Sequence, residues 1–129
     1  MQLCVWAMRQ WFRAAVDGRC VCHVISGAFG IAGVARAAVP FHVAMRTLHG
    51  NARIPLQFGS IGRPSITETE ALIVEAAAAA AQGRTGDLRA VARGLVFRDM
   101  AAVLARSLAS VAVVFAEADL TRPGWRPDP

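Results

Sequence analysis

Two cysteines and a histidine, Cys20, Cys22 and His23, form the densest group of metal-binding residue types in the sequence. On a helix, Cys20 and His23 would lie one turn apart and could share a zinc ion, whereas Cys22 would point elsewhere. Because zinc needs a tetrahedral set of ligands, Cys4 or His42 would have to complete the site from other helices. The group supports a metal-site hypothesis, but buried, reduced thiols are the interpretation that we favour.

No other residue pattern assigns a reaction or a cofactor. The order Cys-x-Cys-His is one residue short of the Cys-x-x-Cys-His used for covalent haem attachment, and it lacks the spacing of a redox dithiol. Ser60 is not part of a Gly-x-Ser-x-Gly nucleophile elbow. Glu68, Glu70 and Glu75 lie at the start and on the flank of an expected helix, where capping and solvation account for them. We therefore expect no catalytic residue and no cofactor.

The N-terminal segment offers a candidate surface for a partner. Apolar residues recur at helical spacing over residues 3–16, and Arg9 and Arg13, four apart, share another face of that helix. Trp6 and Trp11 fall near the boundary between the two faces. The pattern predicts a core helix with a solvated arginine edge. Its alternative is a helix that uses Trp6, Arg9, Trp11 and Arg13 to contact a partner or a membrane surface.

Between this helix and the middle of the chain, glycine and proline set the expected boundaries. A second helix is predicted from residue 19 to about residue 26, with a bend where Gly27, Gly30 and Gly33 make continuous helix costly. The next helix should cover residues 35–49, either kinked at Pro40 or starting there. Residues 52–64 have no steady period and are predicted to form a loop, with one short extended piece at 54–58.

The second half of the chain carries clearer helix signals. Thr67 and Glu70 match a capping box and predict a helix over residues 68–81. A short helix should follow over residues 85–93, ended by Gly94. The last helix, over residues 98–118, carries an apolar stripe that we expect at the centre of the core. This stripe consists of Met100, Val103, Leu104, Leu108, Val111 and Phe115.

Together these elements predict an all-α fold. We expect a single compact bundle of about five helices in residues 1–119, followed by a flexible, Pro/Gly-rich tail in residues 120–129. No internal repeat of the length typical of helical solenoids is present. A chain of 129 residues is the usual size for one core.

Several short segments resemble a family of small bacterial helical proteins of unknown function. The resemblance covers most of residues 3–118 and is carried by Ala7-Met8-Arg9, Phe29-Gly30, the helix over residues 40–49, and Ile66-Thr67 before Glu70. In that family a run of cysteines precedes the threonine-led helix, whereas this chain has Phe58-Gly59-Ser60-Ile61 there. The resemblance implies the helical layout, and it implies no thiol or metal role at this position and no activity.

Charge and hydropathy limit the partners and the compartment. All 14 basic residues are arginine and the net charge is +5, yet the arginines are scattered and lack interleaved aromatic residues, so we do not expect nucleic-acid binding. The longest uncharged run, residues 20–35, is shorter than the roughly 17 to 25 residues that span a bilayer, so we expect no transmembrane span. Three cysteines without a disulfide framework or a preceding signal peptide favour a cytoplasmic protein.

The function predicted from these observations is that of a protein-binding or self-associating module. The alternatives are a small metal-binding or thiol-containing protein that uses Cys20, Cys22 and His23, and a peripheral membrane protein that uses the first helix. The absence of lysine and tyrosine would also suit an alternative frame of GC-rich DNA. The ordered capping signals and the stripe of the last helix argue against that alternative.

Overall fold

The computed structural model describes residues 1–120, and these form an all-α bundle, which confirms the predicted fold class. The described part contains six α-helices, where about five were expected, and one 3-10 helix, η1. The helices are α1 (Gln2–Val16), α2 (Val21–Ile31), η1 (Ala35–Ala37), α3 (Ala38–Asn51), α4 (Glu68–Ala81), α5 (Thr85–Leu95) and α6 (Arg98–Glu117). The expected tail at 120–129 lies outside the described residues except for Leu120.

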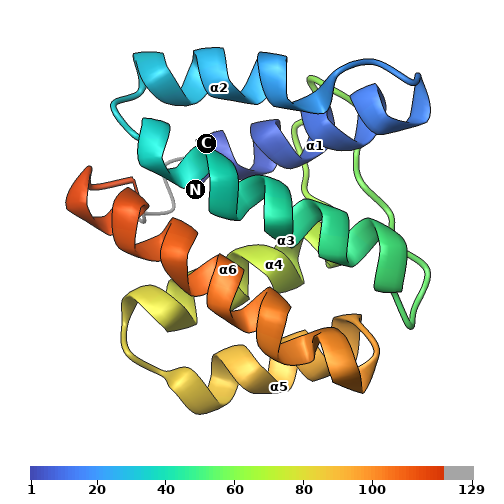
Figure 1. Cartoon of the computed structure of the whole chain (residues 1–129), viewed down its shortest axis with the longest axis vertical. Helices are drawn as coiled ribbons and strands as arrows, with labels where there is room; N and C mark the ends of the chain where they lie inside the picture. Colours follow the sequence, from blue (N-terminus) through green and yellow to red (C-terminus); the bar gives the residue numbers. More distant parts are fainter. Residues whose placement is uncertain (121–129) are drawn as a thin grey trace.

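Helix α6 occupies the middle of the bundle and packs against α3, α4 and α5. Helices α1 and α2 pack against each other, and α2 also contacts α3. As a result, α2 and α5 lie at opposite ends of the molecule, above and below α6 in Figure 1. Each of these two outer helices has one face against the bundle and another face toward solvent.

The core contains side chains from all six helices, with α6 at its centre, and it includes aromatic residues of α2 and α3. Leu104, Leu108, Val111 and Phe115 are buried as the stripe predicted. Phe115 meets the ring of Phe29 at a centroid distance of 5.6 Å, in an edge-on arrangement. Two members of the predicted stripe are displaced from the core: Val103 is exposed and Met100 is half-buried. Successive residues point about 100° apart around a helix, so Val103 faces solvent while Leu104, the next residue, faces the core.

Helix α4 begins as the sequence predicts. The Thr67 hydroxyl accepts a hydrogen bond from the backbone N–H of Glu70 at 3.1 Å, and the Glu70 carboxylate accepts one from the backbone N–H of Thr67 at 2.9 Å. This reciprocal pair is the capping box. It satisfies two of the N–H groups that have no partner within a helix at its N-terminus.

The predicted bend after residue 26 is wrong, because α2 continues through Gly27 and Gly30 to Ile31. Two buried side chains on α2, Ile25 and Phe29, anchor the helix in the core. Their packing outweighs a glycine cost of about 1 kcal/mol per residue. The helix ends at Ile31, and Gly33, two residues further on, has a φ of +77° that suits glycine and allows the Val34 N–H to bond the Phe29 carbonyl at 2.8 Å.

Smaller differences concern the ends of other elements. Helix α5 passes through Gly94 and ends at Leu95, and α3 begins two residues before Pro40, which therefore sits in its first turn. The expected extended piece at 54–58 is not a strand. The described residues show a single isolated bridge, between Ala52 and Val96, which ties the end of α3 to the end of α5.

Among the described residues, one helix, α6, is long and apolar enough to cross a bilayer when judged by length and composition alone. Its apolar side chains are the ones that form the core with α3, α4 and α5. The core helix of a water-soluble bundle has the same composition as a membrane span, because both must be apolar over several turns.

Candidate functional site

The partner surface predicted on the first helix is not assembled as expected. Arg9 is 7% exposed and Trp11 is 3% exposed, so both belong to the interior, whereas Trp6 is half-buried and Arg13 is exposed. The sequence pattern placed Arg9 with Arg13 on a solvated face. That placement is wrong for Arg9, because a carboxylate from another helix meets it inside the fold.

The partner of Arg9 is Glu70, in the first turn of α4. The Arg9 guanidinium donates through Nε to Glu70 Oε2 at 2.8 Å and through Nη2 to Oε1 at 3.0 Å. It also donates to the carbonyls of Arg63 and Ser65, at 2.7 and 2.8 Å. The guanidinium therefore joins α1 to α4 and holds the end of the loop that precedes α4.

The loop closes over this ion pair at Gly59. Its backbone N–H donates to Glu70 Oε2 at 2.9 Å, and a Cβ at this position would lie 2.9 Å from Arg9 Nη2. Only glycine lets the backbone approach the guanidinium this closely. Burial by itself raises the pKa of Glu70, but the hydrogen bonds from Arg9, Thr67 and Gly59 outweigh it and hold the pKa below its usual range. Because the polar atoms of both side chains form hydrogen bonds within the fold, we interpret this ion pair as a structural element.

A second polar group joins α1, α2 and α3. The Trp11 Nε1–H donates to His42 Nδ1 at 3.0 Å, and the Cys22 Sγ lies 3.7 Å from the same nitrogen. Burial, with a contribution from the nearby Arg46, lowers the pKa of His42. The imidazole Nδ1 already accepts a hydrogen bond from Trp11, so the arrangement differs from a cysteine–histidine dyad, in which that nitrogen is free to accept from the thiol.

The predicted metal ligands share one end of α2 without forming a site. Cys20 is the N-cap residue of α2, Cys22 and His23 follow in its first turn, and all three are exposed. The expectation of buried thiols is wrong for both cysteines. It holds for Cys4, whose burial raises its pKa to about 12. Within residues 1–120 there is no group of three or more histidine, cysteine or acidic side chains placed to hold a metal ion.

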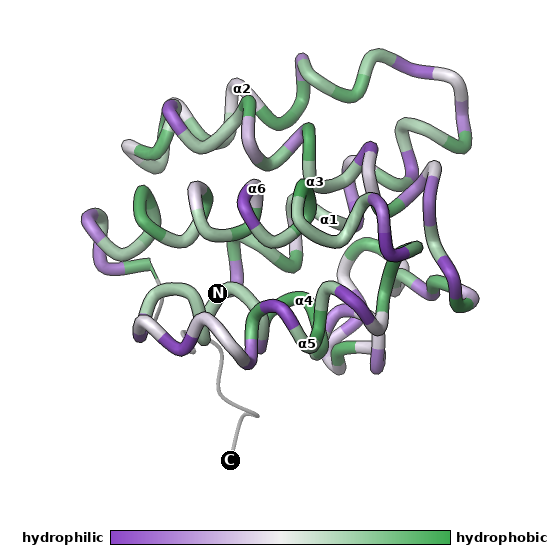
Figure 2. The backbone as a smooth tube through the Cα atoms, turned by 60° about the horizontal axis from the view of Figure 1, so that its bottom comes forward, coloured by the Kyte–Doolittle hydropathy of each residue, from purple (hydrophilic) through white to green (hydrophobic). Residues whose placement is uncertain are grey.

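The most unusual surface of the molecule is that of α2 itself. The helix carries no charged residue, and only Ile25 and Phe29 are buried. Ile31 is 92% exposed at its C-terminal end, and Val39, at the start of the neighbouring α3, is 73% exposed. Figure 2 shows the trace of α2 as largely green or pale, which marks hydrophobic or neutral residues. We call the exposed residues of α2 together with Val39 the α2 surface.

A hollow of about 140 Å³ opens in the α2 surface, between α2 and α3. Its walls include Cys22 and Ser26 on one side and Val39 and His42 on the other, and the Trp11 ring contributes from below. A dry cavity of about this size accommodates a group as large as a benzene ring. The hollow can therefore receive one aliphatic side chain from another molecule.

Sequence reasoning missed both the Arg9–Glu70 pair and the α2 surface. The pair joins residues 61 positions apart, so no local pattern connects them. The α2 surface had a signal, the uncharged run of residues 20–35. The sequence instead predicts a buried or glycine-bent helical segment there, because Gly27, Gly30 and Gly33 make continuous helix costly.

Within the described residues, the chain is an all-α bundle with a buried ion pair, Arg9–Glu70, and an uncharged, exposed α2 surface. Comparisons with known protein families, with curated proteins and with solved structures find no match for this chain.

Proposed function

We propose that this protein is a self-associating module, in which the α2 surface of one copy packs against the α2 surface of a second copy. The observation that carries the proposal is the exposure of an uncharged helix. Ile31, at the end of α2, is 92% exposed, and α2 buries only two of its residues. Val39, at the start of α3, is 73% exposed. Apolar surface of this kind gains free energy when it is removed from water, and contiguous patches of it mark interaction sites.

A second copy of the chain meets little charge repulsion if it binds at the α2 surface. The chain carries a net charge of +5, so two copies repel each other over most orientations. The α2 surface brings no arginine into the contact, and its pairing needs no complementary charge from the partner. A two-fold contact between identical surfaces is also the commonest form of oligomer.

The shape of the surface favours close packing. Gly27 and Gly30 have nothing within 4 Å of the position of an added Cβ, so the outer side of α2 is smooth and open. A helix of the second copy can approach this side closely, and an aliphatic side chain such as that of Ile31 can enter the hollow beside Cys22. Each buried isoleucine or valine side chain contributes roughly 1.5–3 kcal/mol before the cost of association is subtracted.

The experiment measures oligomeric state over a range of concentrations, by size exclusion with light scattering and by sedimentation velocity. We expect a dimer that Ile31→Asp and Val39→Asp each convert to a folded monomer. The matched control is Val113→Asp on α6, which makes the same change at an exposed valine outside the α2 surface and should leave the dimer intact. Circular dichroism verifies that each variant is folded.

A wild-type chain that stays monomeric at every concentration would contradict the proposal. So would a dimer that Val113→Asp disrupts as strongly as Ile31→Asp does. Sedimentation with phosphatidylcholine and phosphatidylglycerol vesicles supplies a further arm. If the wild-type monomer binds vesicles and Ile31→Asp abolishes that binding, the α2 surface contacts a membrane instead of a second copy.

A further inference from the structure

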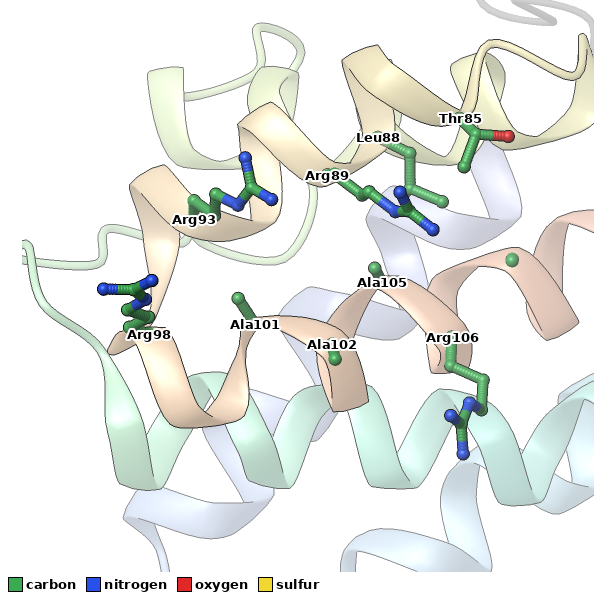
Figure 3. Close-up of a pocket in the computed structure, with 10 residues that line it drawn as sticks. Thr85, Leu88, Arg89, Arg93, Arg98, Ala101, Ala102, Ala105 and Arg106 are labelled. Atoms are coloured by element: carbon green, nitrogen blue, oxygen red, sulfur yellow. The ribbon is translucent and has the colours of Figure 1, made fainter.

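A second surface, independent of the α2 surface, lies between α5 and α6. A groove of about 470 Å³ runs along these two helices, at the end of the molecule opposite to α2. Arg89 and Arg93 of α5 and Arg98 and Arg106 of α6 line this groove, and in Figure 3 the Arg106 side chain extends from α6 away from α5. A second hollow of about 390 Å³ shares Arg93 and Arg98 and adds Arg53. Five arginines therefore border one continuous region.

The positive charge of this groove is not neutralised by the part of the chain that the structure describes. Arg89, Arg93, Arg98 and Arg106 are all exposed, and none of them forms an ion pair with a carboxylate of residues 1–120. Of the acidic residues on α5 and α6, Asp87 pairs with Arg84 and Glu117 pairs with Arg36, whereas Asp99 is exposed and forms no ion pair within the described residues. Several guanidinium groups around one hollow create a positive potential that attracts carboxylates or phosphates.

The floor of the groove is apolar and smooth. It consists of small side chains of α6, including Ala102, Ala105 and Ala109, with Leu88 on the α5 side. Ala101 and Ala105 lie on the side of α6 that faces α5 (Figure 3). Methyl groups on the floor offer no hydrogen bond to a hydrated ion. The floor does fit the apolar side chains of a ligand whose charges reach the arginines at the edges.

We propose that the groove between α5 and α6 binds an acidic, amphipathic helix of a partner protein. The apolar stripe of that helix would lie on the alanine floor, and its carboxylates would pair with the four arginines at the edges. Arg89 and Arg93 are four residues apart on α5, so glutamates spaced four apart on the partner helix match them along the axis. Helix-in-groove binding of this kind is a recurring mode of peptide recognition.

A nucleic acid fits the groove less well. No aromatic residue lines it, so bases would have nothing to stack on, and the alanine floor would face polar phosphates and sugars. A second copy of this chain is also disfavoured, because its own groove and its net charge are positive. Charge and floor together select an acidic protein segment.

The test uses the full chain and a fluorescein-labelled peptide of about 20 residues, built from glutamate, leucine and alanine with glutamates at i and i+4. Fluorescence anisotropy should show binding that weakens with salt. The same peptide with glutamine in place of glutamate should bind much more weakly. Arg89→Gln with Arg93→Gln should weaken binding of the acidic peptide by roughly tenfold or more. The charge-matched control, Arg13→Gln with Arg46→Gln, should stay within about twofold of wild type, because these exposed arginines are remote from the groove.

A second pair of variants tests the floor without removing an arginine. Ala102 is exposed in the groove, and Ala102→Glu should place a carboxylate among the arginines and compete with the peptide. The isosteric Ala102→Gln should weaken binding less. Equal loss of affinity in the Arg89/Arg93 and Arg13/Arg46 variants would overturn the proposal, as would a peptide that binds no better with glutamate than with glutamine. Tighter binding to a duplex DNA or to phosphatidylglycerol vesicles than to the acidic peptide would overturn it as well.

Discussion

At the scale of single residues, the largest concentration of polar contacts surrounds Arg9 and Glu70. The guanidinium makes four hydrogen bonds, and the carboxylate accepts from Arg9, Thr67 and Gly59. Because both groups are removed from water, each depends on the other to offset the cost of desolvation. The sequence predicted the Glu70 half of this arrangement, as part of the capping box. It could not predict Arg9, because helical spacing alone does not show which side chain of α1 will face α4.

Removal of the carboxylate should destabilise the fold strongly. Glu70→Gln leaves the Arg9 guanidinium buried without a counter-charge, and breaking a buried pair in this way costs about 3–5 kcal/mol. Urea unfolding followed by circular dichroism measures this loss. The control is Glu75→Gln, an exposed glutamate on the same helix, for which we expect a change of less than about 0.5 kcal/mol. Equal stability of Glu70→Gln and wild type would show that the pair is not important for folding.

The same carboxylate should make stability depend on acid pH. Its folded-state pKa lies below the usual glutamate value of about 4.3, so the ionised form stabilises the fold above that pH. This contribution is lost as the pH falls through the usual value toward the lower folded-state pKa. Urea midpoints measured from pH 7 to pH 3 should therefore decline more steeply for wild type than for Glu70→Gln. Parallel curves for the two proteins would contradict the assignment.

The three thiols should separate by reactivity. Cys20 and Cys22 are exposed, whereas Cys4 is buried and its pKa is raised to about 12. A thiol reacts as its thiolate, so burial protects Cys4 twice, by excluding the reagent and by suppressing ionisation. Titration with Ellman's reagent at pH 8 should modify two thiols per chain in the native protein and the third only in guanidinium. Cys4→Ser should remove the third thiol, the one that reacts only in guanidinium. Rapid reaction of all three thiols in the native wild-type protein would contradict the burial of Cys4.

At the scale of elements, the helices with explicit capping or periodic signals were predicted best. The bounds of α4 match the prediction at both ends, because Thr67 and Glu70 act locally. The bounds of α2 do not match, because the core contacts of Ile25 and Phe29 come from distant parts of the chain and override the local preference of glycine. The same distinction, between features set by local sequence and features set by contacts between distant parts of the chain, applies to the candidate sites. The groove of α5 and α6 depends on how two helices pack, which their separate sequences do not show.

The cap of α4 should contribute measurably to stability, because Thr67 does more than begin a helix. Its hydroxyl accepts from the Glu70 N–H and also donates to the Gln57 carbonyl at 2.6 Å, which fastens the preceding loop. Thr67→Ala should cost about 1–2 kcal/mol. Thr67→Ser keeps the hydroxyl and should recover most of this loss in a thermal melt. A serine variant as unstable as the alanine variant would mean that the hydroxyl makes no contribution.

At the scale of the whole molecule, the arrangement of the helices separates two surfaces that differ in charge. Helix α2, without charge, lies at one end, and α5, with its arginines, lies at the other (Figures 1 and 2). Pairing of two copies through α2 would leave both grooves exposed and facing away from the contact. A self-associated protein would then present two arginine grooves, so two acidic segments could bind to one assembly. Composition predicted the overall basic charge, but only the fold shows where that charge gathers.

Because α6 lies at the centre of the bundle, one side of it is buried in the core and another side is exposed to solvent. Leu108 is 3% exposed in the core, and Val113, on the same helix, is 55% exposed. In the bundle, Leu108→Asp places an unpaired carboxylate in an apolar interior, at a cost of several kcal/mol against a typical stability of about 5–15 kcal/mol. Val113→Asp places the same group in water. We therefore expect Leu108→Asp to unfold or aggregate and Val113→Asp to keep the wild-type circular dichroism spectrum and solubility. A helix inserted in a bilayer would meet lipid or protein on every side, so both substitutions would be damaging there. Equal damage from the two variants would thus contradict the bundle, and the expected asymmetry would exclude a lipid-facing α6.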